Sequence, residues 1–231
     1  MGADAADFIL GPAGTTVQLT IRRGDKTIRV SIIRQQITIQ MVSDRVLENG
    51  DYYIALTNFG YGSAADIVDA LQRYTDSRAT DLIIDLRHNP GGSVGELEAM
   101  LDVFLPTNSK AFTLRGEGYD YTYTTKKSSL ILPLSSDIIL LVDSGSASAA
   151  EMLALVLQDY GIATLVGETT FGKGTAQSII DYDDGSSFKY TVYERFSSRS
   201  NTSINHQGVK PDYTITLDEN YDNQLEYAKK L

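Results

Sequence analysis

Residues 82–105 read LIIDLRHNPGGSVGELEAMLDVFL, and this stretch decides the fold class. The apolar run Leu82 to Leu86 is short enough to be a buried strand. Asn89-Pro90-Gly91-Gly92 supplies turn chemistry, and Val94 to Leu105 has the apolar spacing of an amphipathic helix. A buried strand, a turn and a helix form a βα unit, so this stretch predicts an α/β protein.

The same pattern occurs before and after this stretch. Tyr52 to Leu56 is strand-like and precedes a helical pattern from Ser63, the expected N-cap, to Tyr74. Ile138 to Val142 is a second buried-strand run, and an Ala- and Leu-rich helix is expected from Ala147 to Tyr160. Three βα units in succession favour an α/β core.

The last part of the chain is rich in strands. Ala163 to Val166 is a short apolar run, and residues 176–216 mostly alternate between polar and apolar side chains. Asp183-Asp184-Gly185 lies between two alternating segments, which is the chemistry of a hairpin turn. We therefore expect strands joined by tight turns after the last βα unit.

The front of the chain predicts a separate small element. Residues 4–10 are expected to end a short helix, and residues 16–21 and 27–33 alternate as the two strands of a β-hairpin. Residues 35–42 are expected to form a connecting strand. Residues 1–36 hold too little apolar surface to fold alone, so we place a boundary between 1–36 and a main domain at 37–231.

Composition excludes several classes of function. The 231 residues carry a net charge of −10, which argues against a nucleic-acid surface. Without cysteine there are no disulfides, thiol nucleophiles or Cys-ligated zinc, and no apolar run is long enough to cross a bilayer. Met1-Gly2-Ala3 lacks the basic and apolar regions of a signal peptide, so any targeting signal is expected outside these residues.

The segment Gly145-Ser146-Ala147-Ser148-Ala149-Ala150-Glu151 carries the first candidate chemistry. A serine at the start of a helix lies near free N–H groups and the positive end of the helix dipole, which can stabilise an oxyanion. The alternative is that either serine is simply an N-cap. Both readings remain open on this segment alone.

A nucleophilic serine needs a base, and the chain offers three candidates. Lys173 lies between two glycines after Phe171, in a turn that is expected to lead from a strand into a helix. A lysine held in an apolar pocket can lose its proton and act as a base. An exposed loop lysine is the alternative. His88 precedes a Pro-Gly-Gly turn and His206 lies in a polar loop, so a Ser-His-Asp triad with Asp85 has no supporting motif.

Two other motifs fail on spacing. Gly172-Lys173-Gly174-Thr175 resembles part of a phosphate loop, but Gly167 lies too near to complete the pattern. Asp181, Asp183 and Asp184 resemble the opening of a calcium loop, but no Glu closes it, so we interpret them as a hairpin turn. The sequence therefore predicts no nucleotide and no metal.

Three segments together resemble the motifs of the C-terminal processing peptidases, which are tail-specific serine proteases. They are residues 85–92 (DLRHNPGG), 145–151 (GSASAAE) and 167–177 (GETTFGKGTAQ), in the family's order and spacing. The similarity covers about residues 50–216 and includes the closing segment GVKPD at 208–212. His88 replaces a more usual Asn or Gly, and Ala150 replaces a common Ser.

The resemblance implies specific roles. Ser148 corresponds to the nucleophile, Lys173 to the base and Gln177 to the residue that orients the lysine. The N–H groups of Ala149 and Gly92 would form the oxyanion hole, and Ser146 would be a structural neighbour. No cofactor is implied.

The resemblance also implies an architecture and a setting. The core would be a crotonase-like (ClpP-like) spiral of βα units with a strand-rich C-terminal part. Residues 1–36 would be the C-terminal remnant of a PDZ domain, without its carboxylate-binding loop. Protein or peptide substrates and an extracytoplasmic location are implied, with a parent protein that could be membrane-anchored; no oligomeric state is implied.

The sequence thus predicts a serine endopeptidase that cleaves polypeptides near their C-termini through a Ser-Lys dyad and an acyl-enzyme. Two alternatives remain. One is a catalytically silent relative that binds peptides through the same fold. The other is a Ser-His hydrolase of small esters that depends on His88 or His206.

Overall fold

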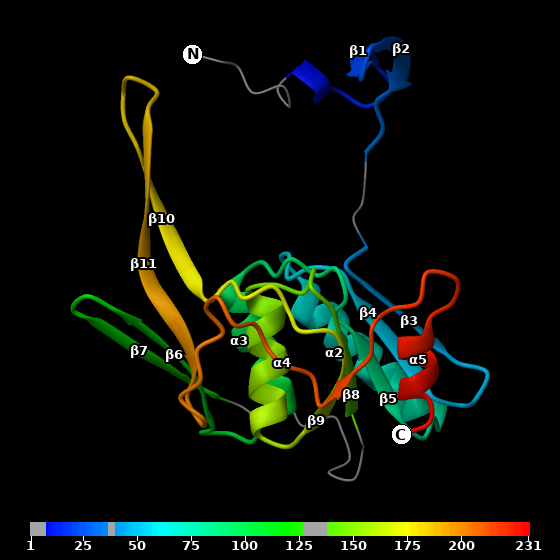
Figure 1. The fold of residues 1–231 in the computed structure, drawn as a ribbon, viewed down its shortest axis with the longest axis vertical. Coiled ribbons are helices and arrows are strands. Elements are labelled where there is room, and N and C mark those ends of the chain that lie inside the picture. The colour runs from blue at the N-terminus through cyan, green and yellow to red at the C-terminus, as the bar shows by residue number, and fades with distance from the viewer. Residues whose placement is uncertain (1–7, 37–39, 127–137) are drawn as a thin grey trace. The chain divides into compact units, whose positions relative to one another are not determined.

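The computed structural model describes residues 8–36, 40–126 and 138–231 (Figure 1). The chain divides into two compact units. One comprises Met1–Ile39 with Asp181–Ser186, and the other comprises Gln40–Ile180 with Ser187–Leu231. Each unit is considered separately below.

The first unit contains the predicted β-hairpin. β1 (Thr16–Arg23) pairs antiparallel with β2 (Lys26–Ile33), from Thr16 opposite Ile33 to Arg23 opposite Lys26. The turn is made by Gly24 and Asp25, and Gly24 has a φ of 60°. No residue of either strand is buried, which agrees with the expectation that this segment has little core.

Two predictions at the ends of the hairpin fall partly outside the described residues. The helix expected at 4–10 lies mostly there, and Phe8 and Ile9 are helical. The connecting strand expected at 35–42 includes residues 37–39, which are also outside. The strand that follows begins only at Val42, so the prediction placed it too early.

The second unit is built on a six-stranded sheet. Its strands are β3 (Val42–Val46), β4 (Tyr52–Leu56), β5 (Leu82–Asp85), β8 (Ile138–Val142), β9 (Ala163–Gly167) and β12 (Tyr213–Thr214). Their order across the sheet is β12-β9-β8-β5-β4-β3, and every neighbouring pair except β3 and β4 is parallel. All residues of β5 and β8 are buried, which confirms the buried-strand predictions.

Helices cover both faces of this sheet (Figure 1). α2 (Ser63–Ser77), α3 (Val94–Phe104) and α4 (Ala149–Asp159) share the main core with Leu82 and Ile84. Ile83 points to the opposite face, where it packs in a smaller cluster with Ala228 of α5 (Asn223–Ala228). Alternate residues of β5 thus enter two cores, which explains why its sequence is continuously apolar.

A second sheet carries the remaining strands in the order β10-β11-β6-β7. They are β6 (Lys110–Gly116), β7 (Tyr119–Thr124), β10 (Thr175–Asp181) and β11 (Ser187–Ser197). β10 and β11 confirm the strand-rich tail, whereas β6, β7 and the short helix α5 were not predicted. No helix within the described part of the chain is long and apolar enough to span a membrane.

Two local predictions are wrong. The N-cap of α2 is Gly62, with a φ of 90°, and not Ser63. The carboxylate of Glu96 takes the capping role, because it accepts hydrogen bonds from the N–H groups of Gly62 (3.0 Å) and Ala64 (2.8 Å). The turn that contains Lys173 leads into the strand β10 and not into a helix.

Candidate active site

The three motif segments meet at one edge of the six-stranded sheet. They follow β5, β8 and β9, which are adjacent and parallel, so their carboxyl ends lie together. The N–H of Ala147 donates to the carbonyl of Asn89 at 2.9 Å, and the N–H of Phe171 donates to the carbonyl of Ser146 at 3.0 Å. Segments about 80 residues apart in the sequence therefore form one site.

Ser148 occupies the N-cap position of α4 in an unusual backbone conformation. Its φ is 59° and its ψ is −112°, a region that residues other than glycine rarely adopt. Only 6% of the residue is exposed, and its Oγ accepts a hydrogen bond of 2.9 Å from Nη1 of Arg195. A strained, nearly buried serine at a helix start is a feature of functional sites.

Two backbone N–H groups belong to segments that lie next to Ser148. The N–H groups of Ala149, at the first position of α4, and of Gly92 have no acceptor among the residues that the structure describes. Gly91 packs directly on the serine, since a Cβ there would lie 2.9 Å from Cβ of Ser148 and 2.7 Å from N of Ala149. Gly91 also has a φ of 89°, so both the close contacts and the backbone conformation disfavour a side chain at this position.

Glu151 organises the site, although the sequence analysis gave it no role. Its side chain is fully buried, and its two oxygens accept four hydrogen bonds. The donors are the N–H groups of Ser148 (2.8 Å), Lys173 (2.9 Å) and Gly172 (2.7 Å) and the hydroxyl of Thr170 (2.6 Å). One carboxylate thus fixes the segments of both candidate catalytic residues; the Ser-x-x-Glu capping-box pattern was the available signal.

Glu151→Gln should destabilise the protein by about 3 kcal/mol, because an amide N–H would face backbone donors in a buried site. The free energy of unfolding in urea measures this effect. Glu226→Gln is the matched control, since Glu226 is half-exposed and forms a surface ion pair with Lys229. That variant should lose less than about 1 kcal/mol. Equal losses in the two variants would contradict the organising role of Glu151.

Lys173 comes to the site through its backbone. Its N–H is held by Glu151, but its side chain is exposed, and the amine has no hydrogen bond or ion pair with any described residue. Gln177 is also exposed, on β10. Lys173 lies before β10 begins and Gln177 lies within it, so the two residues are not one turn apart on a helix.

Neither histidine side chain is hydrogen-bonded to Ser148 within the described residues, although the backbone N–H of His206 donates to the carbonyl of Gly172 at 2.9 Å. Nδ1 of His88 is 2.8 Å from Oδ2 of Asp143, and 79% of the His88 side chain is exposed. Asp143 also accepts from the N–H of Ser146 (3.0 Å), whose hydroxyl donates to the carbonyl of Leu86 (2.8 Å). This geometry gives Ser146 and His88 a part in shaping the turn.

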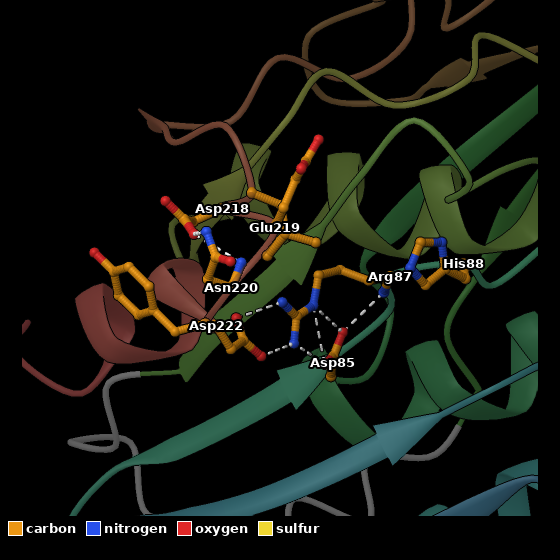
Figure 2. Close-up of a pocket in the computed structure, with 9 residues that line it drawn as sticks. Asp85, Arg87, His88, Asp218, Glu219, Asn220 and Asp222 are labelled. Atoms are coloured by element: carbon orange, nitrogen blue, oxygen red, sulfur yellow. Dashed lines mark hydrogen bonds and ion pairs between the residues drawn. The ribbon is translucent and has the colours of Figure 1, made fainter.

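A pocket of about 420 Å³ lies between the β5 end and the segment before α5 (Figure 2). Arg87 bridges Asp85 (2.6 Å) and Asp222 (2.7 Å) beside it. Burial alone would raise the pKa of Asp222, but the hydrogen bonds from Arg87 outweigh this and lower it. The first motif therefore contributes an ion-pair network that ties α5 to the sheet.

Metal chemistry finds no support in the described residues. Within 8–36, 40–126 and 138–231, no group of three or more His, Asp or Glu side chains is arranged to hold an ion.

The sequence model of peptidase family S41 matches residues 52–215. The chain is 32% identical over 220 residues to the carboxyl-terminal-processing peptidase 2, chloroplastic, of Arabidopsis thaliana, covering 92% of this chain and 42% of that protein. It is also 32% identical over 215 residues to the carboxy-terminal processing protease CtpA of Bacillus subtilis (strain 168), covering 93% of this chain and 46% of that protein. The chain thus spans less than half the length of these two relatives.

The fold is similar to that of a solved protease. The photosystem II D1 C-terminal processing protease superimposes with a TM-score of 0.70 at 24% identity, covering 95% of this chain and 60% of that one. At this identity the likeness describes the fold, a mixed α/β architecture.

Proposed function

The chain belongs to peptidase family S41, and from this membership and the geometry around Ser148 we propose that it is a serine endopeptidase. The observation that carries the proposal is Ser148 itself, strained and nearly buried at the start of α4. Free N–H donors of Ala149 and Gly92 lie on the flanking segments. This arrangement suits a nucleophile with an oxyanion hole.

The proposed reaction is acyl transfer. The neutral amine of Lys173 takes the proton of Ser148, and the alkoxide attacks a peptide carbonyl whose oxygen is stabilised by the N–H groups of Ala149 and Gly92. The amine side of the peptide leaves with a proton, and water then hydrolyses the acyl-enzyme. Gln177 is proposed to orient the lysine in the productive state.

The dyad requires one rearrangement. Glu151 already holds the backbone of Lys173, and in the proposed scheme the exposed lysine side chain turns towards Ser148. Catalytic hydrogen bonds are often incomplete without substrate, so the present separation is compatible with the proposed role. The described geometry corresponds to a resting arrangement in this scheme.

Substrate class and location follow from the relatives. Their names describe carboxyl-terminal processing, so we propose that this chain cleaves polypeptides near their C-termini and works outside the cytoplasm. Its net charge of −10 disfavours nucleic-acid partners. The reaction as written needs no cofactor.

The architecture is proposed to be a crotonase-like spiral of βα units, with 37–231 as the catalytic core and 1–36 as the C-terminal remnant of a PDZ domain. The support is a separate compact unit that holds a two-stranded hairpin with exposed apolar side chains, such as Ile21 and Ile33.

The test of the proposed function is covalent labelling of the 231-residue protein with a fluorophosphonate. A single adduct is expected, and peptide mapping should place it on Ser148. An unmodified protein would support a catalytically silent peptide-binding relative, which the presence of both Ser148 and Lys173 argues against. Labelling that requires His88 or His206 would instead support a Ser-His hydrolase.

A further inference from the structure

Arg195 of β11 is the side chain that contacts the proposed nucleophile. Its Nη1 donates to Oγ of Ser148 at 2.9 Å, and its backbone N–H donates to the carbonyl of Gly174 at 2.8 Å. The second bond attaches β11 to the segment that carries Lys173. Arg195 is 7% exposed, so its guanidinium is positioned by the fold and largely removed from water.

The charge of Arg195 is not neutralised by an ion pair. No carboxylate among the described residues lies within ion-pair distance of it. The groups whose charges oppose the effect of burial on Arg195 are Tyr193 and Glu151, and the two oxygens of Glu151 already accept four other hydrogen bonds. Burial lowers the pKa of Arg195, but a guanidinium keeps its proton under these conditions.

Arg87 is a buried arginine with a structural role, and its contacts can be compared with those of Arg195. It is also buried, and it is paired with the carboxylates of Asp85 and Asp222. Arg195 instead gives its one side-chain hydrogen bond within the described residues to the neutral hydroxyl of Ser148. Burying a cation without a paired carboxylate lowers the stability of the folded protein, so such a cation indicates that the charge serves a function.

We propose that Arg195 is a catalytic residue that stabilises the negative charge developing on Oγ of Ser148. The inference rests on the proposed function of Ser148. When the O–H bond breaks, the proton goes to the Lys173 amine and the electron pair stays on Oγ, where the guanidinium donor already points. That pair then forms the bond to the carbonyl carbon, and the carbonyl π electrons move to its oxygen. The donor is in place before the charge appears, which is the condition for electrostatic catalysis.

The experiment compares the second-order rate of fluorophosphonate labelling of Ser148 in the full chain and three variants. Arg195→Gln should be about 100-fold slower, since it removes a preorganised donor at the reacting atom. Arg195→Lys keeps a cation and should remain within about tenfold of the parent. Arg199→Gln is the matched control, because Arg199 is exposed and stacks on Tyr160. Its rate should not change.

A rescue arm separates chemistry from folding. Added methylguanidinium should restore labelling of Arg195→Gln at least about fivefold, whereas equal ionic strength of sodium chloride should not. Labelling of Arg195→Gln at the parent rate would overturn the inference. Faster labelling would also overturn it and would show that Arg195 restrains the serine. If Arg195→Gln is slow, is not rescued by methylguanidinium and labels at the same rate as Arg195→Lys, the role of Arg195 is structural. A parent protein without a Ser148 adduct would overturn the proposed function, and with it this inference.

Discussion

Ser148→Ala should lower the rate of peptide cleavage by about 10⁴-fold or more, because it deletes the proposed nucleophile. The fold should persist. The change leaves Nη1 of the buried Arg195 without its acceptor, which should cost about 1–3 kcal/mol of stability. Initial rates on an unfolded protein substrate, together with urea unfolding, measure the two quantities separately.

Ser146→Ala is the control two residues away, and it should lose stability but keep its activity. The Ser146 hydroxyl is fully buried, donates to the carbonyl of Leu86 (2.8 Å) and accepts from the N–H of Asp143 (3.0 Å). Its loss leaves buried groups unsatisfied and should cost about 1–3 kcal/mol of stability. Activity should stay within about tenfold of the parent under conditions where the variant is folded. An inactive Ser146 variant beside an active Ser148 variant would show that the nucleophile has been misassigned.

The sequence predicted the strands best where all of their residues are buried. β5 and β8 are short strands, apolar apart from Asp85, that are buried on both faces, and the second and third predicted βα units along the chain are built on them. β6 and β7 were missed because their alternation is irregular and their pairing depends on contact with β11. α5 was missed because it is short and polar, and it is held by the Arg87 network and by tertiary packing.

The motif residues of the site could be predicted, but its internal contacts could not. Glu151 lies three residues after Ser148, so its capping-box position was visible, but its bonds to Gly172 and Lys173 depend on the tertiary fold. Arg195 lies 47 residues from Ser148 in a strand with no distinctive local pattern. The prediction that Lys173 begins a turn into a helix failed because pairing with β11 makes the following segment a strand.

Lys173→Arg should be as inactive as Lys173→Ala, with both variants at least about 10³-fold below the parent in peptide cleavage. A guanidinium keeps its proton at any working pH, so arginine can supply the positive charge but cannot accept the serine proton. Because the Lys173 side chain is exposed, neither substitution should change stability by more than about 0.5 kcal/mol. Loss of activity in a fully folded protein would therefore report on proton transfer.

Lys210→Arg is the matched control for this comparison, since Lys210 is also exposed and lies in the closing motif outside the site. It should cleave at the parent rate. Near-parent activity of Lys173→Arg would refute the lysine as base, because a group that cannot lose its proton would then suffice. The Arg195 variants distinguish the two cations: Arg195→Lys should stay within about tenfold of the parent because that position needs a charged donor. Lys173→Arg should not, because that position needs a group that can accept a proton.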